Sequence, residues 1–252
     1  MDHNNKASRI LTRREALITS LGVIGGILSL PGCKRPAPPT YGNILRMGDD
    51  FTYSAQRSLL PELSLAKEYN LGDISSFPAT GTINPGDSSK PGFNENYSKA
   101  LDTNFDQWRM PVEGSVAKPR SFSLHELQSF PVRNQITKHT CEEGWTAIAQ
   151  WHGVQLSRIL QAVGIKPSAR FVNFQTYDGW TDSIDMIDAF HPQTILAYGM
   201  NGKNLPIPHG APVRLRVEKQ IGYKSFKYIE KIIITDEFVD TGDSGWAWYV
   251  GM

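Results

Sequence analysis

The sequence predicts an α+β fold with mixed, mostly antiparallel sheets and short helices. In the second half of the chain, apolar residues alternate with polar ones over several short runs, as in half-buried strands. Two of these runs flank Asn201-Gly202, a pair typical of a two-residue hairpin turn. Helical spacing is confined to a few short segments, and short helices among many strands are typical of an α+β domain.

The composition is that of a globular chain with a sizeable core. The 252 residues are 40% hydrophobic and 20% charged, which excludes a disordered chain. The 26 basic and 25 acidic residues nearly balance, so nothing favours nucleic acid as a partner. The two cysteines, Cys33 and Cys141, are too few for a disulfide-stapled fold, a four-cysteine iron–sulfur cluster, or a zinc site of four cysteines, and no CxxCH haem motif is present. One cofactor bound by a single thiolate is compatible with this count.

Residues 1–33 are expected to be an export signal. Arg13 and Arg14 precede a Gly-rich apolar run that ends at Leu30, in a pattern that resembles a twin-arginine signal. The run of about 15 residues is shorter than the ~20 that a membrane-spanning helix needs. We therefore expect a periplasmic protein with the twin-arginine export machinery as a partner. Leu30-Pro31-Gly32-Cys33 resembles a lipoprotein cleavage box, so Cys33 is either a lipid anchor or removed with the signal.

After the signal, a Pro-rich linker at residues 34–41 leads into one domain at residues 42–252. A weak helical pattern extends over residues 42–69, and the Gly-, Pro- and Ser-rich residues 72–96 are expected to be irregular. Alternation at residues 105–116 predicts a strand. Ser123 and Glu126 form a capping-box pattern that opens a short helix, with Leu124 and Leu127 facing inward.

The later elements follow from clearer patterns. Helical spacing at residues 154–163 ends at Gly164, and strands are expected at residues 169–176 and 229–235. The hairpin strands are residues 194–200 and 205–207. Residues 213–218 predict a half-buried strand whose polar face carries Arg214, Arg216 and Glu218.

Three segments are candidates for a functional site. Cys141 lies among polar residues near Lys138 and His139, as a nucleophile or metal ligand would, although an inert buried thiol fits equally. Residues 204–214 form a Pro-rich loop that can aim His209, with Arg214 after it. Residues 222–227 form a turn whose amides and lysines, Lys224 and Lys227, can hold an anion such as phosphate. Taken singly, each of these cations could instead be a surface charge, and His209 a satisfied core histidine.

Together these segments resemble the molybdopterin-binding domain of the sulfite-oxidase family, in the same order over residues 105–236. The resemblance is closest to exported, single-domain bacterial members, a group that includes the periplasmic methionine sulfoxide reductases. It rests on the following motifs: Thr140-Cys-Glu-Glu-Gly-Trp145, Trp151-His-Gly-Val154, Asp185-Met-Ile-Asp-Ala-Phe-His-Pro-Gln-Thr194, His209-Gly-Ala-Pro-Val-Arg214 and Gly222-Tyr-Lys-Ser-Phe-Lys227.

The resemblance implies a molybdenum ion on one molybdopterin, with the Cys141 thiolate as its protein ligand and neither haem nor an iron–sulfur cluster. Glu143 would lie near the metal as a proton-handling group. Residues with an implied role in cofactor binding are Thr176, His209, Arg214, Ser225, Phe226 and Lys227.

Two departures from the family pattern bear on the reaction. The Cys-x-Gly-Asn-Arg pattern of sulfite oxidases is absent here, where Cys141 is followed by Glu-Glu-Gly-Trp. The early Asn…Tyr-Glu cofactor contact of the methionine sulfoxide reductases is not visible in residues 42–57. We therefore expect two-electron or oxygen-atom transfer on a small S- or N-oxide, with electrons exchanged with a c-type cytochrome or a membrane haem protein.

Three other functions stay open on the sequence. The first is a sulfite-oxidising enzyme that passes electrons to a cytochrome. The second is a metal-free thiol enzyme that uses Cys141 and His139, and the third is a cofactor-less binding protein. Zinc binding by His139 and Cys141 is least favoured, because no further ligand pair has suitable spacing.

Overall fold

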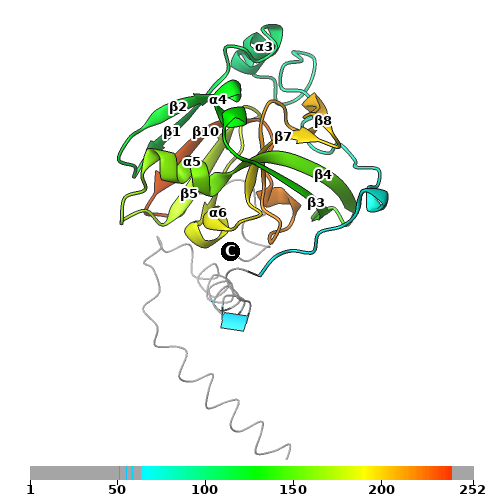
Figure 1. Cartoon of the computed structure of the whole chain (residues 1–252). Helices are drawn as coiled ribbons and strands as arrows, with labels where there is room; N and C mark the ends of the chain where they lie inside the picture. The colour runs from blue at the N-terminus through cyan, green and yellow to red at the C-terminus, as the bar shows by residue number, and fades with distance from the viewer. Residues whose placement is uncertain (1–50, 52–54, 56–57, 60–63, 240–252) are drawn as a thin grey trace, which may run out of the picture.

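The computed structural model describes residues 64–239 together with Phe51, Ala55, Ser58 and Leu59 (Figure 1). The expected export signal, Cys33, the linker and most of the expected helix at residues 42–69 lie outside the described residues. Phe51, Ala55, Ser58 and Leu59 fall within that expected helix and are helical, as predicted. From residue 64 the prediction was wrong, because the chain is extended there. The backbone N–H of Tyr69 donates to Ile136 O (2.8 Å), so this segment runs along a sheet edge instead of coiling.

The described residues form two five-stranded sheets, which Figure 1 shows side by side. The strand order is β2-β1-β10-β5-β6 in the first sheet and β3-β4-β7-β8 in the second, where β9 also pairs with β7. The β1–β10 pair is parallel and the other strand pairs are antiparallel, which confirms the predicted fold class. The strands are β1 Arg109–Gly114, β2 Arg120–Ser123, β3 Val132–Thr140, β4 Thr146–Gln155, β5 Phe171–Thr176, β6 Thr181–Asp185, β7 Ile195–Met200, β8 Lys203–Asn204, β9 Arg214–Arg216 and β10 Ile229–Thr235.

Short helices cover the sheets. The capping box is confirmed, because Ser123 Oγ accepts from the Glu126 N–H (3.1 Å) and the Glu126 carboxylate accepts from the Ser123 N–H (2.8 Å). No helix among the described residues is long and apolar enough to cross a membrane. The helices are α3 Glu95–Asp102, α4 Leu124–Ser129, α5 Leu156–Val163 and α6 Met186–Phe190, with 3-10 turns at Leu71–Asp73, Ile207–His209 and Gly222–Lys224.

Two predicted elements are shorter than the sequence pattern. Helix α5 ends at Gly164 as expected but begins at Leu156, because Val154 belongs to β4 and pairs with Leu196 of β7. The hairpin turn at Asn201-Gly202 has both residues at positive φ, which matches its sequence. Its return strand β8 ends at Asn204, before the residues expected to form it.

Val154 and Leu196, on one face of the second sheet, belong to the large core, whereas the opposite face carries a small core of its own. Trp151 of β4 is its largest member, and Phe77 packs against it from the irregular segment before α3. Strand β9 pairs with β7 and brings Arg214 and Arg216 onto this face, where both are buried. The expectation of a solvent-facing polar side for β9 was therefore wrong: both arginines stack over the Trp151 ring inside the protein.

Candidate active site

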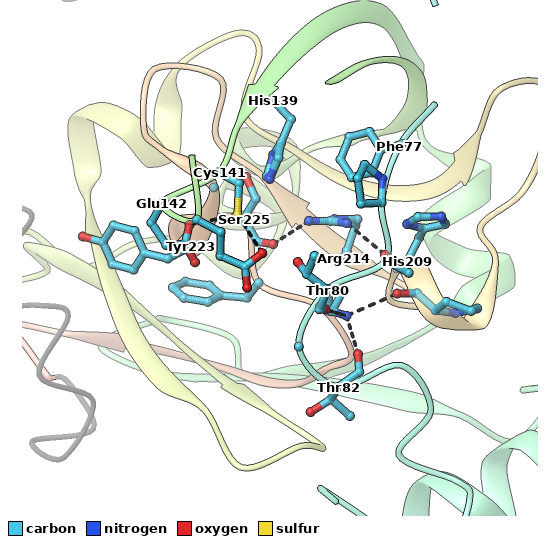
Figure 2. Close-up of a pocket in the computed structure, with 18 of the residues that line it drawn as sticks. Phe77, Thr80, Thr82, His139, Cys141, Glu142, His209, Arg214, Tyr223 and Ser225 are labelled. Atoms are coloured by element: carbon cyan, nitrogen blue, oxygen red, sulfur yellow. Dashed lines mark hydrogen bonds between the residues drawn. The ribbon is translucent and has the colours of Figure 1, made fainter. Parts of the chain in front are cut away.

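A cavity of about 260 Å³ lies between the face of the second sheet that carries Trp151 and the turns that follow β3, β5 and β9 (Figure 2). Residues 77–82 cross one side of it as an extended strap, which we call the strap below. All eight residues predicted for the site line this cavity: Cys141, Glu143, Thr176, His209, Arg214, Ser225, Phe226 and Lys227.

Cys141 is the first residue after β3, in a tight turn. Its N–H donates to Trp145 O (2.9 Å), its carbonyl accepts from the Gly144 N–H (3.1 Å), and Gly144 takes a positive φ of 89° that glycine adopts readily. The turn presents a thiol that is 7% exposed to the cavity. The Cys141 Sγ lies 3.6 Å from a carboxylate oxygen of Glu142 and 3.9 Å from one of Glu143.

These surroundings keep the free thiol protonated. Burial, joined by the charges of Glu142 and Glu143 and opposed by the Glu143 N–H, raises the pKa of Cys141 to about 11. Such a thiol ionises when a metal cation binds it. The His139 imidazole bonds Arg216 rather than Cys141, so it is not placed as the base of a metal-free thiol enzyme.

The turn supplies two carboxylates where the sequence pointed to one. Glu143, as predicted, reaches the thiol, and it also accepts a hydrogen bond from the Trp145 indole N–H (3.0 Å). Glu142 is the closer of the two and was missed. Adjacent residues in a strand would point apart, but the tight turn after β3 brings both side chains to the same side.

Arg214 carries positive charge into the far wall of the cavity. Its guanidinium donates to the backbone carbonyls of His209 (3.1 Å) and Ser225 (2.8 Å), and its Nε has no partner among the described residues. Burial, joined by the nearby Arg216 charge, lowers the pKa of Arg214 to about 9. Carbonyls satisfy its hydrogen bonds without neutralising it, which is the environment that an anionic ligand would complete.

The Lys227 ammonium holds the strap. Its Nζ donates to the carbonyls of Thr80 (2.8 Å), Pro208 (3.2 Å) and Thr82, and burial lowers the pKa of this lysine to about 8. Lys224, expected beside it on the anion-binding turn, instead lies buried against Asp182 (2.7 Å) and does not line the cavity.

His209 and Thr176 complete the walls. The His209 ring packs edge-on against Phe77, with 5.5 Å between ring centroids. Burial lowers the pKa of His209 to about 4, and the Arg214 and Lys227 charges add to this, so the ring is neutral at pH 7. The Thr176 hydroxyl donates to Asp178 (2.6 Å), whose pKa is raised by burial.

The strap is a further part of the site that sequence reasoning missed. Residues 77–82 were expected only to be irregular, and nothing in their composition indicates a cavity wall. Pro78 and Gly81 are consistent with an extended, turning segment. Its place follows from partners far along the chain, Lys227 and Tyr228, whose side chains donate to its carbonyls.

The donor set fits the cofactor that the resemblance implies. Within the described part of the chain, no group of three or more His, Cys, Asp or Glu side chains is placed to hold a metal. A single cysteine suits a metal that brings its remaining ligands on an organic cofactor. The unpartnered Arg214 Nε and Tyr223 hydroxyl are buried polar atoms at the cavity, as an anionic, hydrogen-bonding cofactor requires.

Known proteins are similar to this chain in sequence and in fold. The family described as the oxidoreductase molybdopterin binding domain matches residues 97–241. A putative protein-methionine-sulfoxide reductase subunit, YedZ1, of Azospira oryzae is 31% identical over 246 residues, which cover 96% of this chain and 88% of that protein. The protein-methionine-sulfoxide reductase catalytic subunit MsrP of Campylobacter jejuni is 33% identical over 157 residues, 56% of this chain and 53% of that protein.

Among solved structures, the sulfane dehydrogenase SoxCD of Paracoccus pantotrophus is similar in fold. The match has a TM-score of 0.51 and 24% identity, and covers 53% of this chain and 39% of that chain.

Proposed function

The chain belongs to the oxidoreductase molybdopterin-binding domain family, and on that premise we propose that it is an exported reductase of S-oxides such as methionine sulfoxide. As a family member it is a molybdenum cofactor-dependent oxidoreductase. The observation that carries the proposal is one cavity with a buried thiol, Cys141, in one wall and an uncompensated guanidinium, Arg214, in another. When bound there, the molybdenum cofactor supplies the two-electron chemistry.

Different residues of the chain would bind the metal, bind the rest of the cofactor and exclude water. Cys141 binds the metal, and Arg214 receives the anionic group of the cofactor through its free Nε. The neutral His209 ring offers a hydrogen bond to the cofactor, and the Thr176 hydroxyl, which donates to Asp178, can accept one. The backbone of residues 225–227 lies along the cofactor. Lys227 keeps the strap closed over the cavity, which excludes water from one side.

Reduction of a sulfoxide consumes two electrons and two protons and releases the oxygen as water. Glu143 is placed to deliver a proton, because its carboxylate borders the thiol and is oriented by the Trp145 indole N–H. Glu142 is a second proton carrier at the same wall. The aromatic rings of Phe77 and Trp145 offer an apolar surface for the alkyl groups of the substrate.

Two lines support a sulfoxide rather than sulfite. The relatives YedZ1 and MsrP are named as protein-methionine-sulfoxide reductase subunits. The arginine that the sulfite-oxidase pattern places four residues after the cysteine is absent here, where Trp145 takes that position. In the same proposal, residues 1–33 direct twin-arginine export to the periplasm, and Cys33 is a candidate lipid anchor. Electrons come from a c-type cytochrome or a membrane haem protein, in keeping with relatives that are named as subunits.

Elemental analysis and two assays test this function. We expect close to one molybdenum per chain in protein exported from a host that makes molybdopterin. That protein should reduce methionine sulfoxide with a reduced viologen as electron donor, and should oxidise sulfite with ferricyanide far more slowly. The proposal would be contradicted if folded, exported protein held no molybdenum. It would also be contradicted if molybdenum-loaded protein oxidised sulfite and did not reduce methionine sulfoxide.

A further inference from the structure

His139 lines the cavity, and the function proposed above gives it no role. The residue leads into the Cys141 turn from the end of β3, and its side chain is 7% exposed. Its imidazole packs against two aromatic rings that also contact each other, with centroid distances of 5.1 Å to Phe77 and 5.4 Å to Trp145. A ring packed in this way has little freedom to turn.

Arg216 determines which imidazole nitrogen carries the hydrogen. Its Nη1 lies 2.6 Å from His139 Nδ1, and an arginine N–H can only donate. Nδ1 is therefore the acceptor, and the hydrogen of the imidazole lies on Nε2. Arg216 cannot swing away, because Glu218 accepts two hydrogen bonds from it (3.1 and 2.7 Å) and its guanidinium stacks over Trp151.

The opposite edge of the ring faces the cavity beside the thiol. A Cβ atom built on Gly222 would lie 2.5 Å from His139 Nε2 and 3.2 Å from Cys141 Cα, so the imidazole edge and the cysteine backbone meet at this glycine. No described residue accepts a hydrogen bond from Nε2. Figure 2 shows the His139 ring pointing from β3 into the space that Cys141 and Arg214 border.

We propose that His139 is a specificity-determining residue whose Nε2–H donates a hydrogen bond to the oxygen of a neutral dialkyl sulfoxide. This inference rests on the proposed function and names the group that recognises the substrate oxygen. The oxygen lies on Nε2 and the alkyl groups lie against Phe77 and Trp145, which matches the polar and apolar halves of a sulfoxide. A single donor on an uncharged ring holds such an oxygen without the charge pairing that an anion such as sulfite calls for.

Four variants of the molybdenum-loaded protein separate this role from a structural one. His139→Phe keeps the aromatic packing and removes the donor, whereas His139→Gln keeps an N–H donor and an oxygen that Arg216 can bond. Gly222→Ala keeps His139 and places a methyl group against Nε2, at a residue whose φ is not in the positive range. Gly72→Ala is the matched control, because a Cβ there has no atom within 4 Å.

The probe is methionine sulfone, which keeps sulfur-bound oxygen and serves as an inert analogue. We measure its binding by calorimetry, together with molybdenum content, thermal unfolding, and kcat and KM for methionine sulfoxide. We expect His139→Phe and Gly222→Ala to bind the sulfone about 10-fold more weakly at unchanged molybdenum content. His139→Gln should recover most of the affinity, and Gly72→Ala should equal the wild type.

Three results would overturn the role. Wild-type affinity in loaded His139→Phe would leave no function for the Nε2–H, while the proposed reductase activity stood. Loss of molybdenum from both His139 variants would make His139 a cofactor-binding residue instead. Loaded wild-type protein that neither binds the sulfone nor reduces methionine sulfoxide would contradict the proposed function and this inference with it.

Discussion

The indole of Trp151 lies against the guanidinium of Arg214, with 5.1 Å between the guanidinium carbon and the ring centroid. Arg216 stacks on the same ring at 4.6 Å. Two like charges thus share one aromatic surface, but Arg216 is paired with Glu218 (2.7 Å) whereas Arg214 bonds only carbonyls. One tryptophan therefore supports both a structural ion pair and a cation that is left for a ligand.

Arg214 is expected to be necessary for cofactor retention. Arg214→Gln should lower the molybdenum content about 10-fold or more, because it removes the buried charge that offsets the anionic group of the cofactor. Arg214→Lys should be intermediate, since an ammonium lacks the planar fork that holds the His209 and Ser225 carbonyls. Elemental mass spectrometry on exported protein measures this, and full molybdenum content in Arg214→Gln would refute the assignment.

Cys141→Ser is expected to abolish molybdenum binding and leave the fold intact. A hydroxyl has nearly the shape of the thiol but is a harder and far less acidic ligand. Circular dichroism and the urea midpoint should stay close to those of wild-type protein without cofactor. Retention of one molybdenum per chain would show that another group holds the metal.

Lys227→Met is expected to release the strap. The substitution keeps the aliphatic volume but leaves the carbonyls of Thr80, Thr82 and Pro208 without their charged donor, which should reduce the free energy of unfolding by about 2–3 kcal/mol. Limited proteolysis should then cut within residues 77–82.

Lys231→Met is the control for this experiment. Lys231 pairs with Glu113 at the surface (3.3 Å), so its loss should change stability by less than about 1 kcal/mol. Equal stability and equal protease resistance in the two variants would mean that the Lys227 contacts do not hold the strap.

Gly153→Ala is expected to disrupt the second sheet. A Cβ at this position would lie 2.1 Å from Leu196 O and 2.7 Å from Ala197 Cα, where β4 and β7 shift register. These are backbone atoms of β7, which cannot move aside without breaking the strand pairing, so we expect the free energy of unfolding to fall by about 3 kcal/mol or more, measured by urea unfolding. Gly72→Ala, where a Cβ meets nothing, should be near neutral; similar losses in both would contradict the steric cause.

Acid is expected to destabilise the protein partly through His191. Its Nε2 bonds Ser64 O (3.1 Å) and its Nδ1 accepts from the Gln193 N–H (3.3 Å), so the buried ring is held neutral. Burial is the largest effect on the pKa of His191 and lowers it, and the charge of Lys219 lowers it too. The Ser64 carbonyl and the charges of Asp188 and Glu218 oppose this shift without cancelling it.

The sign of this effect follows from proton linkage. The unfolded chain, with a histidine pKa of about 6.5, binds the proton more readily than the folded state. The contribution of His191 to stability is therefore complete above that pKa and is lost as the pH falls toward its lower folded value. Urea midpoints at pH 7.5 and 5.5 should differ less in His191→Gln than in wild type, and an equal difference would exclude the residue as a source.

Local sequence was sufficient for elements that depend on neighbouring residues. The capping box at Ser123, the Gly164 end of α5 and the Asn201-Gly202 turn each depend on contacts or dihedral angles within a few residues. For the same reason the Cys141 and Arg214 motifs were recognisable, and both residues line the cavity.

By itself, then, the sequence determined the fold class, the family and the residues that carry charge or sulfur toward a cofactor. Only the tertiary structure decided which partners those residues meet. Alternation along β9 could not show that Arg216 is buried and bonded to His139, because β7 and β3 bring those residues together from distant parts of the chain. The strap, likewise, is a cavity wall because Lys227 binds its carbonyls. The sequence of residues 77–82 alone does not indicate that partner.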